Sequence, residues 1–359
     1  MSFLIRALRI FKDAVFTPSL PLRTRALLLI LQPITLLTYT IEWAVSRKFP
    51  HSSEIRIPIK GTRKSGHTLR AVVYTPKPNP KSQVPVSASP QPQKVPLHLN
   101  IHGGAFLGGL PEGNARFCHR LAEKSGAVVV STSYRYAPAH TFPASHEDVR
   151  DVAEYLLQNA ERLWGADPAV FTVSGFSVGG NLAFSVAQEL SGSGAVKGLV
   201  SFEGVVDFRL PPWDKPKPPD FPAVDPLAIL QPLFDAYAGP NRARDMGNPL
   251  LHPTLADLSV LPQNVLFVVG GADILRDETV KMAERLEQEA EASNRERKID
   301  TPDEADGTAT VVRMNVVEGQ IHGWTELPSF AIDEALRTKA FDDAISFLRA
   351  VHRAYGFVA

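Results

Sequence analysis

The segment Phe171–Phe184 constrains the fold of this chain more than any other part of its sequence. It reads Phe-Thr-Val-Ser-Gly-Phe-Ser-Val-Gly-Gly-Asn-Leu-Ala-Phe, so a β-branched run leads into a serine framed by glycines and then into a helical pattern. Gly175 and Gly179 flank Ser177 in the order Gly-x-Ser-x-Gly, which suits a strand-to-helix turn too tight for a side chain at either glycine. The segment therefore predicts a strand, a sharp turn that projects Ser177, and a helix.

The expected direction of that helix favours chemistry at Ser177 that develops negative charge. A helix N-terminus presents free backbone N–H groups and the positive end of the helix dipole. Acyl transfer places a negative charge on the carbonyl oxygen of the substrate, which such donors stabilise. Because the Gly-x-Ser-x-Gly pattern should occur by chance in roughly one chain in ten of this length, the prediction needs support from other residues.

Strand and helix patterns alternate along most of the chain and predict its fold class. Strands are expected at 95–101, 127–131, 170–176, 195–202, 264–269 and 310–317, with helices at 115–124, 144–160, after Ser177, up to Glu289 and at 331–355. Several strands are apolar on both faces, as in a mostly parallel sheet covered by helices on both sides. Two period-two segments, Glu54–Ile59 and Thr68–Tyr74, predict a hairpin that opens the sheet. At 359 residues, the chain fits one α/β catalytic domain over residues 51–359 with additions.

Three segments depart from this alternation. Pro76–Pro96 is rich in proline, lysine, serine and glutamine, and predicts a solvated loop. A stretch rich in proline and aromatic residues begins at Pro211, and we interpret about 208–245 as an inserted cap. Glu291–Thr308 is hydrophilic enough to be a surface excursion.

Residues 1–50 form the other addition, and two interpretations of their first helix remain open. Three basic residues fall on one helical face opposite an apolar face: Arg6, Arg9 and Lys12. Such a helix either lies in a membrane interface or caps the enzyme.

The more hydrophobic stretch Ala26–Val45 is long enough to cross a bilayer. It is interrupted by Gln32, Pro33 and Glu42. Basic residues flank it on both sides, so the flanking charges do not predict its orientation in a membrane. Membrane association through residues 1–48 is therefore one prediction, with the endoplasmic reticulum as a candidate membrane, and a cytoplasmic location is the alternative.

The charge balance and the cysteine count narrow the classes of partner and site. The chain has 38 basic residues (lysine and arginine) and 38 acidic residues (aspartate and glutamate). This balance gives no electrostatic reason to bind nucleic acid. The single cysteine, Cys118, excludes an intramolecular disulfide and a cysteine-based metal cluster. Its place in an expected helix predicts a buried and unreactive thiol. We expect a small substrate, no cofactor and no metal, and leave the oligomeric state open.

Two residues that follow later strands complete a catalytic pattern with Ser177. Asp273 comes after the strand at Asn264–Val269, and His322 comes after the last strand. Asp277 competes with Asp273, since a carboxylate just past a strand often caps a helix. The order serine, aspartate, histidine, each beyond a successive strand, is the order of the α/β-hydrolase catalytic triad.

Each of these residue types has a chemical task. A neutral serine hydroxyl is a poor nucleophile, so His322 must take the proton of Ser177 while Asp273 orients the imidazole. The oxyanion needs donors that are already in place, and His102-Gly-Gly supplies them because glycine lets the backbone approach closely. We assign the oxyanion hole to the backbone at Gly103, Gly104 and Val178, with His102 positioning the loop.

Several motifs in the chain resemble the hormone-sensitive-lipase-like branch of α/β-hydrolases, which includes arylacetamide deacetylases and many microbial carboxylesterases. The resemblance runs from about Leu97 to the C-terminus. It rests on His102-Gly-Gly-Ala-Phe106, Tyr134-Arg-Tyr-Ala-Pro138, Phe142-Pro-Ala144, Glu147-Asp148, Gly175-Phe-Ser-Val-Gly-Gly-Asn181, Asp273-Ile-Leu-Arg-Asp277 and His322-Gly-Trp324.

This resemblance implies an α/β-hydrolase fold and esterase activity without a cofactor. It implies that Asp273, the first aspartate of its motif, is the triad acid. It also implies a pocket roofed by residues 1–50 together with the insertion at about 208–245.

The chain departs from the pattern of this family at three places. Phe176 and Val178 flank Ser177 where an acid and an alanine are usual, which predicts less room for a substrate beside the serine. Ala105 stands where a third glycine is common, so one oxyanion donor is less freely placed. Trp324 replaces a phenylalanine, a change expected to affect packing alone.

The leading hypothesis is a serine hydrolase that cleaves carboxylic esters with acetyl or other short to medium acyl groups, through an acyl-enzyme on Ser177. The alternative is a non-catalytic ligand receptor on the same fold. Some receptors of this kind have broken triads, so the presence of His322 favours the enzyme. No feature favours a peptidase. We expect a small apolar ester as substrate, in a pocket for which the aromatic candidates are Phe106, Phe176, Trp213, Phe221 and Phe234.

Overall fold

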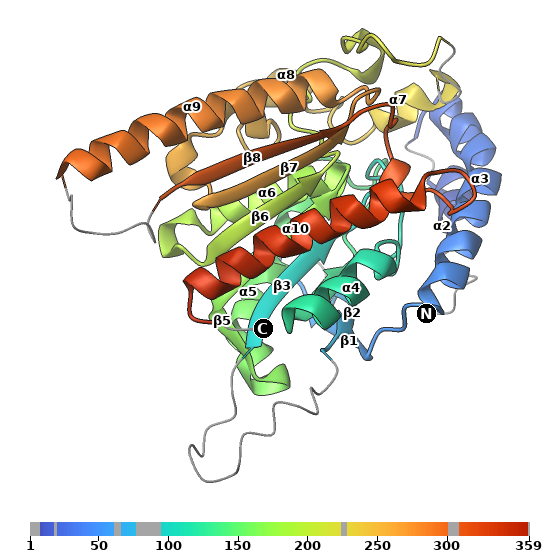
Figure 1. Cartoon of the computed structure of the whole chain (residues 1–359). Coiled ribbons are helices and arrows are strands. Elements are labelled where there is room, and N and C mark those ends of the chain that lie inside the picture. The colour runs from blue at the N-terminus through green and yellow to red at the C-terminus, as the bar shows by residue number, and fades with distance from the viewer. Residues whose placement is uncertain are drawn as a thin grey trace.

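The computed structural model describes a central β-sheet flanked by helices (Figure 1). Within the described part of the chain, eight strands form one sheet in the order β1-β2-β4-β3-β5-β6-β7-β8. The strand β2 is antiparallel to both of its neighbours, whereas the strands from β4 across to β8 run parallel. The described residues are 8–17, 20–60, 66–76, 95–223, 228–300 and 309–357.

The strands lie close to where the sequence predicts them. They are β1 Ser53–Pro58, β2 Thr68–Tyr74, β3 Val95–Ile101, β4 Val128–Thr132, β5 Ala166–Phe176, β6 Val196–Phe202, β7 Asn264–Gly270 and β8 Val311–Val317. The pairing of β1 with β2, with Ile57 opposite Leu69, confirms the predicted hairpin. The mostly parallel sheet confirms the α/β fold class.

Helices cover both faces of the sheet. They are α2 Arg9–Phe16, α3 Leu22–Ser46, α4 Ala115–Ser125, α5 Ala144–Trp164, α6 Val178–Glu189, α7 Gln231–Phe234, α8 Arg242–Asp245, α9 Arg276–Asp300 and α10 Glu334–Ala354. Short 3₁₀ turns are η2 Ser191–Ser193, η3 Pro212–Asp214, η4 Ala228–Leu230, η5 Pro253–Leu255, η6 Leu258–Val260 and η7 Trp324–Glu326.

Among the described residues, the two largest apolar clusters of the core lie one on each face of the sheet. The helices α5, α6 and α9 contribute to the larger cluster, while α4 and α10 pack together on the other face (Figure 1). Cys118 is fully buried in α4, as predicted, and burial raises the pKa of its thiol. Trp324 is also fully buried in this second cluster, which agrees with the packing role expected for it.

The charged helix predicted to end at Glu289 is longer than predicted and includes the first part of the stretch predicted as a surface excursion, Glu291–Thr308. The helix α9 continues to Asp300, because this stretch is built largely from glutamate, arginine, lysine and alanine, which are good helix formers. Residues 301–308 lie outside the described residues. The predicted loop at 76–96 also lies mostly outside them, since 77–94 are not described.

The N-terminal segment forms two helices that pack on the catalytic domain. The helix α3 contacts α2, α4 and α7, so it touches the segment interpreted as an insertion (Figure 1). That segment consists of short helical turns, including η3, α7 and α8. By length and composition, α3 is apolar enough to cross a membrane. The cap predicted from these two segments stays a prediction.

Candidate active site

Ser177 lies at a sharp turn between β5 and α6, as the glycine pattern predicts. Its backbone has φ 52° and ψ −121°, which places a non-glycine residue in a sparsely populated region. A Cβ at Gly175 would lie 1.9 Å from the Gly179 carbonyl oxygen, and one at Gly179 would lie 2.1 Å from that of Ile101. Both positions require glycine because backbone atoms occupy the space of any side chain.

The structure brings Ser177, His322 and Asp273 together in a line of hydrogen bonds. The Ser177 Oγ lies 3.0 Å from His322 Nε2, and His322 Nδ1 lies 3.0 Å from Asp273 Oδ2. Since a carboxylate accepts, Nδ1 carries a proton, and in the neutral ring the Nε2 lone pair faces the serine hydroxyl. This is the tautomer that a general base requires. Asp277 instead pairs with Arg276, so Asp273 is the aspartate that reaches His322.

Charged neighbours change the proton affinity of His322. Burial alone would lower its pKa, but the Asp273 carboxylate, assisted by Glu203 and Glu326, outweighs burial and raises the pKa to about 9. These carboxylates therefore stabilise the protonated form of His322 relative to the neutral ring. That suits a group that must hold a proton between two steps of a reaction.

The predicted oxyanion loop follows β3 and adopts an unusual backbone. Gly104, Ala105 and Phe106 have φ values of 103°, 53° and 60°. A Cβ at Gly104 would lie 2.3 Å from the Gly108 carbonyl oxygen, so that position needs glycine. Ala105 is held in the left-handed region at a cost of about 1–2 kcal/mol, which gives a physical reason for a glycine there.

Gly103 is the part of this loop that lies beside Ser177. A Cβ built on Gly103 would be 3.3 Å from the Ser177 Cβ and 3.1 Å from the Phe176 carbonyl oxygen. Val178 is the first residue of α6 and lies at the same turn. Two of the three residues predicted to form the oxyanion hole, Gly103 and Val178, thus lie beside Ser177 and come from two segments.

His102 connects this loop to two tyrosines. Its ring stacks on Tyr134 with a centroid distance of 4.6 Å, and burial lowers its pKa to about 4. The neutral ring donates from Nδ1 to the Gly103 carbonyl oxygen at 2.7 Å, because that oxygen can only accept. Its Nε2 lies 3.1 Å from the Tyr136 hydroxyl. These contacts agree with a positioning role for His102.

The N-terminal helices hold the far end of the same loop, a feature absent from the predictions. The Gly109 backbone N–H donates to the Tyr39 hydroxyl of α3 at 2.8 Å. Arg9 of α2 donates to the Leu107 carbonyl oxygen, and its guanidinium lies 4.5 Å from the centre of the Tyr136 ring. Tyr39 belongs to no motif, and Arg9 enters the sequence analysis only as part of a basic helix face, so the tertiary contacts alone reveal that they hold this loop.

Two glutamates beside the triad were also missed. Glu203 follows β6 directly, just as Ser177 follows β5, and its Oε2 lies 3.9 Å from His322 Nδ1. Glu326 accepts a hydrogen bond from Asn114 Nδ2 at 2.8 Å, and its Oε2 would be 3.2 Å from a Cβ at Gly103. The position of Glu203 at the end of a strand is a signal that sequence analysis could have used.

The prediction of one aromatic pocket is wrong for two of its five residues. Phe106 is fully buried and stacks on Tyr237 at 3.8 Å, in the larger cluster. Phe176 is 1% exposed and stacks on Phe202 at 4.4 Å, in the cluster on the other face of the sheet. Side chains without accessible surface on opposite faces of a sheet cannot line one pocket.

Phe176 therefore does not reduce the room beside Ser177 as predicted, because it takes a core position. The remaining three candidates lie within the segment interpreted as an insertion. Trp213 is about half exposed, while Phe221 and Phe234 are partly buried. Their place in a substrate pocket stays a prediction.

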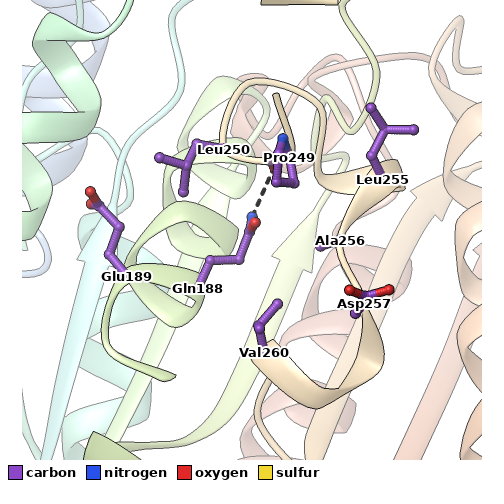
Figure 2. A pocket seen from close by; sticks show the side chains of 8 residues that line it. All are labelled: Gln188, Glu189, Pro249, Leu250, Leu255, Ala256, Asp257 and Val260. Atoms are coloured by element: carbon purple, nitrogen blue, oxygen red, sulfur yellow. Dashed lines mark hydrogen bonds between the residues drawn. The ribbon is translucent and has the colours of Figure 1, made fainter. Parts of the chain in front are cut away.

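A separate cavity of about 270 Å³ lies at the far end of α6 (Figure 2). Its lining comes from the end of α6 and the segment before β7: Gln188, Glu189, Pro249, Leu250, Leu255, Ala256, Asp257 and Val260. The Gln188 Nε2 donates to the Pro249 carbonyl oxygen at 3.0 Å. Ser177 immediately precedes the first residue of α6. At a rise of 1.5 Å per residue, the helix separates Ser177 from Gln188 by about 16 Å. This cavity is therefore not part of the site around Ser177.

Comparison with known proteins identifies the family of this chain. The family model described as alpha/beta hydrolase fold matches residues 98–301, more than half of the chain. The chain belongs to the α/β-hydrolase fold family. The match covers the predicted oxyanion loop, Ser177 and Asp273, and it confirms the fold that the motifs imply.

Several proteins similar to this chain carry the names of esterases or deacetylases. The chain is 29% identical over 205 residues to Esterase LipI of Mycobacterium tuberculosis, covering 55% of this chain and 61% of LipI. It is 44% identical over 93 residues to arylacetamide deacetylase of Oryctolagus cuniculus, covering 25% of this chain and 23% of the deacetylase. The chain thus spans less than two thirds of either curated relative.

A solved structure in the family matches over a longer stretch. The hyperthermophilic esterase from the archaeon Pyrobaculum calidifontis superposes with a TM-score of 0.65 at 28% identity. The superposition covers 88% of this chain and 92% of that esterase. These similarities confirm the resemblance to the branch that includes arylacetamide deacetylases and microbial esterases.

Proposed function

We propose that the protein is a serine hydrolase that cleaves carboxylic esters through an acyl-enzyme on Ser177. The observation that carries this proposal is the line from Ser177 Oγ through His322 to the buried Asp273, with both hydrogen bonds at about 3 Å. Esterase names among the relatives and the solved structure support the same reaction class.

The proposed reaction has two halves that share one base. Ser177 Oγ attacks the ester carbonyl carbon while His322 Nε2 takes its proton, and the carbonyl oxygen becomes an oxyanion beside Gly103 and Val178. The bond to the alcohol then breaks, and His322 returns the proton to the leaving alcohol. Water attacks the acyl-enzyme in the same way, which releases the carboxylic acid and restores Ser177.

The proposed substrate is a small apolar ester with an acetyl or other short to medium acyl group. The names of the relatives support this choice, since they include an ethyl acetate hydrolase of Pseudomonas putida as well as the deacetylase. A panel of 4-nitrophenyl esters from two to twelve acyl carbons tests it. Rates highest at the long end of the panel would contradict it.

Ser177→Ala tests the mechanism. We expect it to abolish turnover of 4-nitrophenyl acetate and covalent labelling by a fluorophosphonate, while the wild-type protein does both. A non-catalytic receptor would show neither labelling nor turnover in the wild-type protein. A mutant with wild-type turnover would contradict the acyl-enzyme on Ser177.

We also propose that the N-terminal helices bind the surface of a membrane. One face of α3 is buried against the protein: Leu27, Leu28, Leu31, Gln32, Thr35 and Tyr39. The opposite face exposes a second apolar stripe: Leu22, Leu29, Ile30, Ile34 and Leu37. An interfacial helix presents such a stripe to lipid, whereas a spanning α3 would have to leave its buried contacts.

Cations near this stripe favour an anionic lipid surface. Lys12, Arg23, Arg47 and Lys48 are exposed along α2 and at the two ends of α3. Phe11, Val15 and Phe16 of α2 add exposed apolar area beside them. Each basic residue near an anionic surface contributes about 1 kcal/mol of attraction.

Flotation with phosphatidylserine-containing vesicles tests this second proposal. The full-length protein should float, and the variant Ile30→Glu/Leu37→Glu should remain at the bottom of the gradient. Carbonate should release the bound protein. Retention after carbonate would support a spanning helix instead, and a wild-type protein that never floats would contradict membrane binding.

A further inference from the structure

Glu203 occupies a strained and buried position at the carboxyl edge of the sheet. It is the first residue after β6, between Ser177 after β5 and Asp273 after β7. Its φ of 51° lies in the left-handed region, and its backbone N–H donates to the Val268 carbonyl oxygen at 2.7 Å. A non-glycine residue persists in this conformation only where its surroundings hold it there.

The side chain of Glu203 faces His322 and its neighbour. Its Oε2 accepts a hydrogen bond from the Gly323 backbone N–H and lies 3.9 Å from His322 Nδ1. Its Oε1 is buried and has no hydrogen-bond partner among the described residues. The side chain is 2% exposed, so it cannot reach bulk water. A buried carboxyl group is costly unless a partner compensates it, and His322 is the cation within reach.

Three ionisable groups face Glu203, and they act in opposite directions. Burial raises the pKa of Glu203 to about 8, the His322 imidazolium lowers it, and the carboxylates of Asp273 and Glu326 raise it. Phe176 and Ser177, at the end of the adjacent strand β5, contribute no charge. In turn, the Glu203 carboxylate is one of the groups that raise the pKa of His322.

We infer that Glu203 is a positioning residue for His322. Glu203 holds the backbone that follows the histidine and places a second carboxyl group beside Nδ1 of the imidazole. This inference rests on the proposed function, in which His322 is the general base. Asp273 takes the Nδ1 proton and sets the tautomer. Glu203 fixes the loop that carries the ring and, when ionised, stabilises the imidazolium formed as Ser177 attacks.

The variant Glu203→Gln separates the charge from the hydrogen bond. Glutamine still offers an acceptor to the Gly323 N–H but carries no charge. Because an ionised Glu203 favours the imidazolium, its removal should move the acidic limb of kcat/KM to lower pH by roughly half to one unit. Glu318→Gln, which removes an exposed carboxylate from the segment after β8, should leave the limb where it is. A Glu203→Gln profile that superposes on the wild type would overturn the inference.

A proton titration of His322 tests the contact without using turnover. In the wild-type protein, the imidazole C–H resonance assigned by its loss in His322→Gln should titrate in two steps, because the ring and the Glu203 carboxyl are coupled. A single step in the wild-type protein would overturn the inference, even if Glu203→Gln fails to fold. Since this readout needs no catalysis, it stands apart from the Ser177→Ala test of the proposed function.

Discussion

The two sides of the site are held in place by different parts of the molecule. Ser177, Asp273 and His322 follow β5, β7 and β8, so the parallel sheet sets their separation. The loop at 103–109 also starts from a strand, but its far end is tied to α2 and α3 through Arg9 and Tyr39. The acid–base side therefore depends on the core of the domain, whereas the oxyanion side depends also on helices packed at its surface.

The two sides should therefore tolerate different perturbations. The core strands that carry the triad separate only when the whole domain unfolds. Contacts made by peripheral helices break locally at a lower free-energy cost. Changes to the N-terminal helices should alter the oxyanion loop without disturbing the hydrogen bonds of His322.

The largest effect is expected from Asp273→Asn on the triad side. The amide can donate to His322 Nδ1 and so favours the wrong tautomer, which in comparable triads lowers kcat by about 10⁴-fold. Turnover of 4-nitrophenyl acetate at saturating substrate measures it. Asp277→Asn is the matched control, and an equal loss there would contradict Asp273 as the triad acid.

Gly104→Ala should produce the next largest effect, on the oxyanion side. A Cβ there would lie 2.3 Å from the Gly108 carbonyl oxygen at a φ of 103°, so the loop must shift and its donors lose their positions. Loss of one oxyanion donor costs about 10²–10³ in kcat. Gly192→Ala, where a Cβ meets nothing within 4 Å, is the control. An active Gly104→Ala enzyme would remove Gly104 from the oxyanion hole.

The pH profile should report the electrostatics of the triad side. His322 must be neutral to accept the serine proton, and its pKa is raised to about 9. Below that pH the neutral fraction falls, so kcat/KM should drop about tenfold per pH unit well below the pKa. A profile measured from pH 6 to pH 10 checks this. A plateau that extends down to pH 7 would contradict the raised pKa.

Tyr39→Phe should give the smallest effect and tests the N-terminal contact directly. It removes the hydroxyl that accepts from the Gly109 N–H at 2.8 Å, a bond worth about 1 kcal/mol. We expect kcat to fall severalfold while the acidic limb of the pH profile stays unchanged. Tyr355→Phe in the C-terminal segment is the control. A shifted limb in Tyr39→Phe would mean that the two sides are not separable.

Much of the fold and of the site could be predicted because each signal was local. The glycines around Ser177 and the strand before them form one continuous segment, and Asp273 and His322 each follow a predicted strand. The surface excursion at Glu291 was predicted from hydrophilicity, which does not distinguish an exposed helix from a loop. The aromatic pocket failed because a sequence does not state which face of the sheet a phenylalanine takes.

Short stretches of sequence were enough to predict the turn at Ser177, the order of the triad and the parallel sheet that brings its members to one edge. These follow from steric limits at glycine and from the alternation of strands and helices, both of which are readable in short segments. The tertiary structure alone decided that Glu203 faces His322 and that Arg9 and Tyr39 hold the oxyanion loop. Those contacts join residues far apart in the chain, and their geometry depends on how complete elements pack.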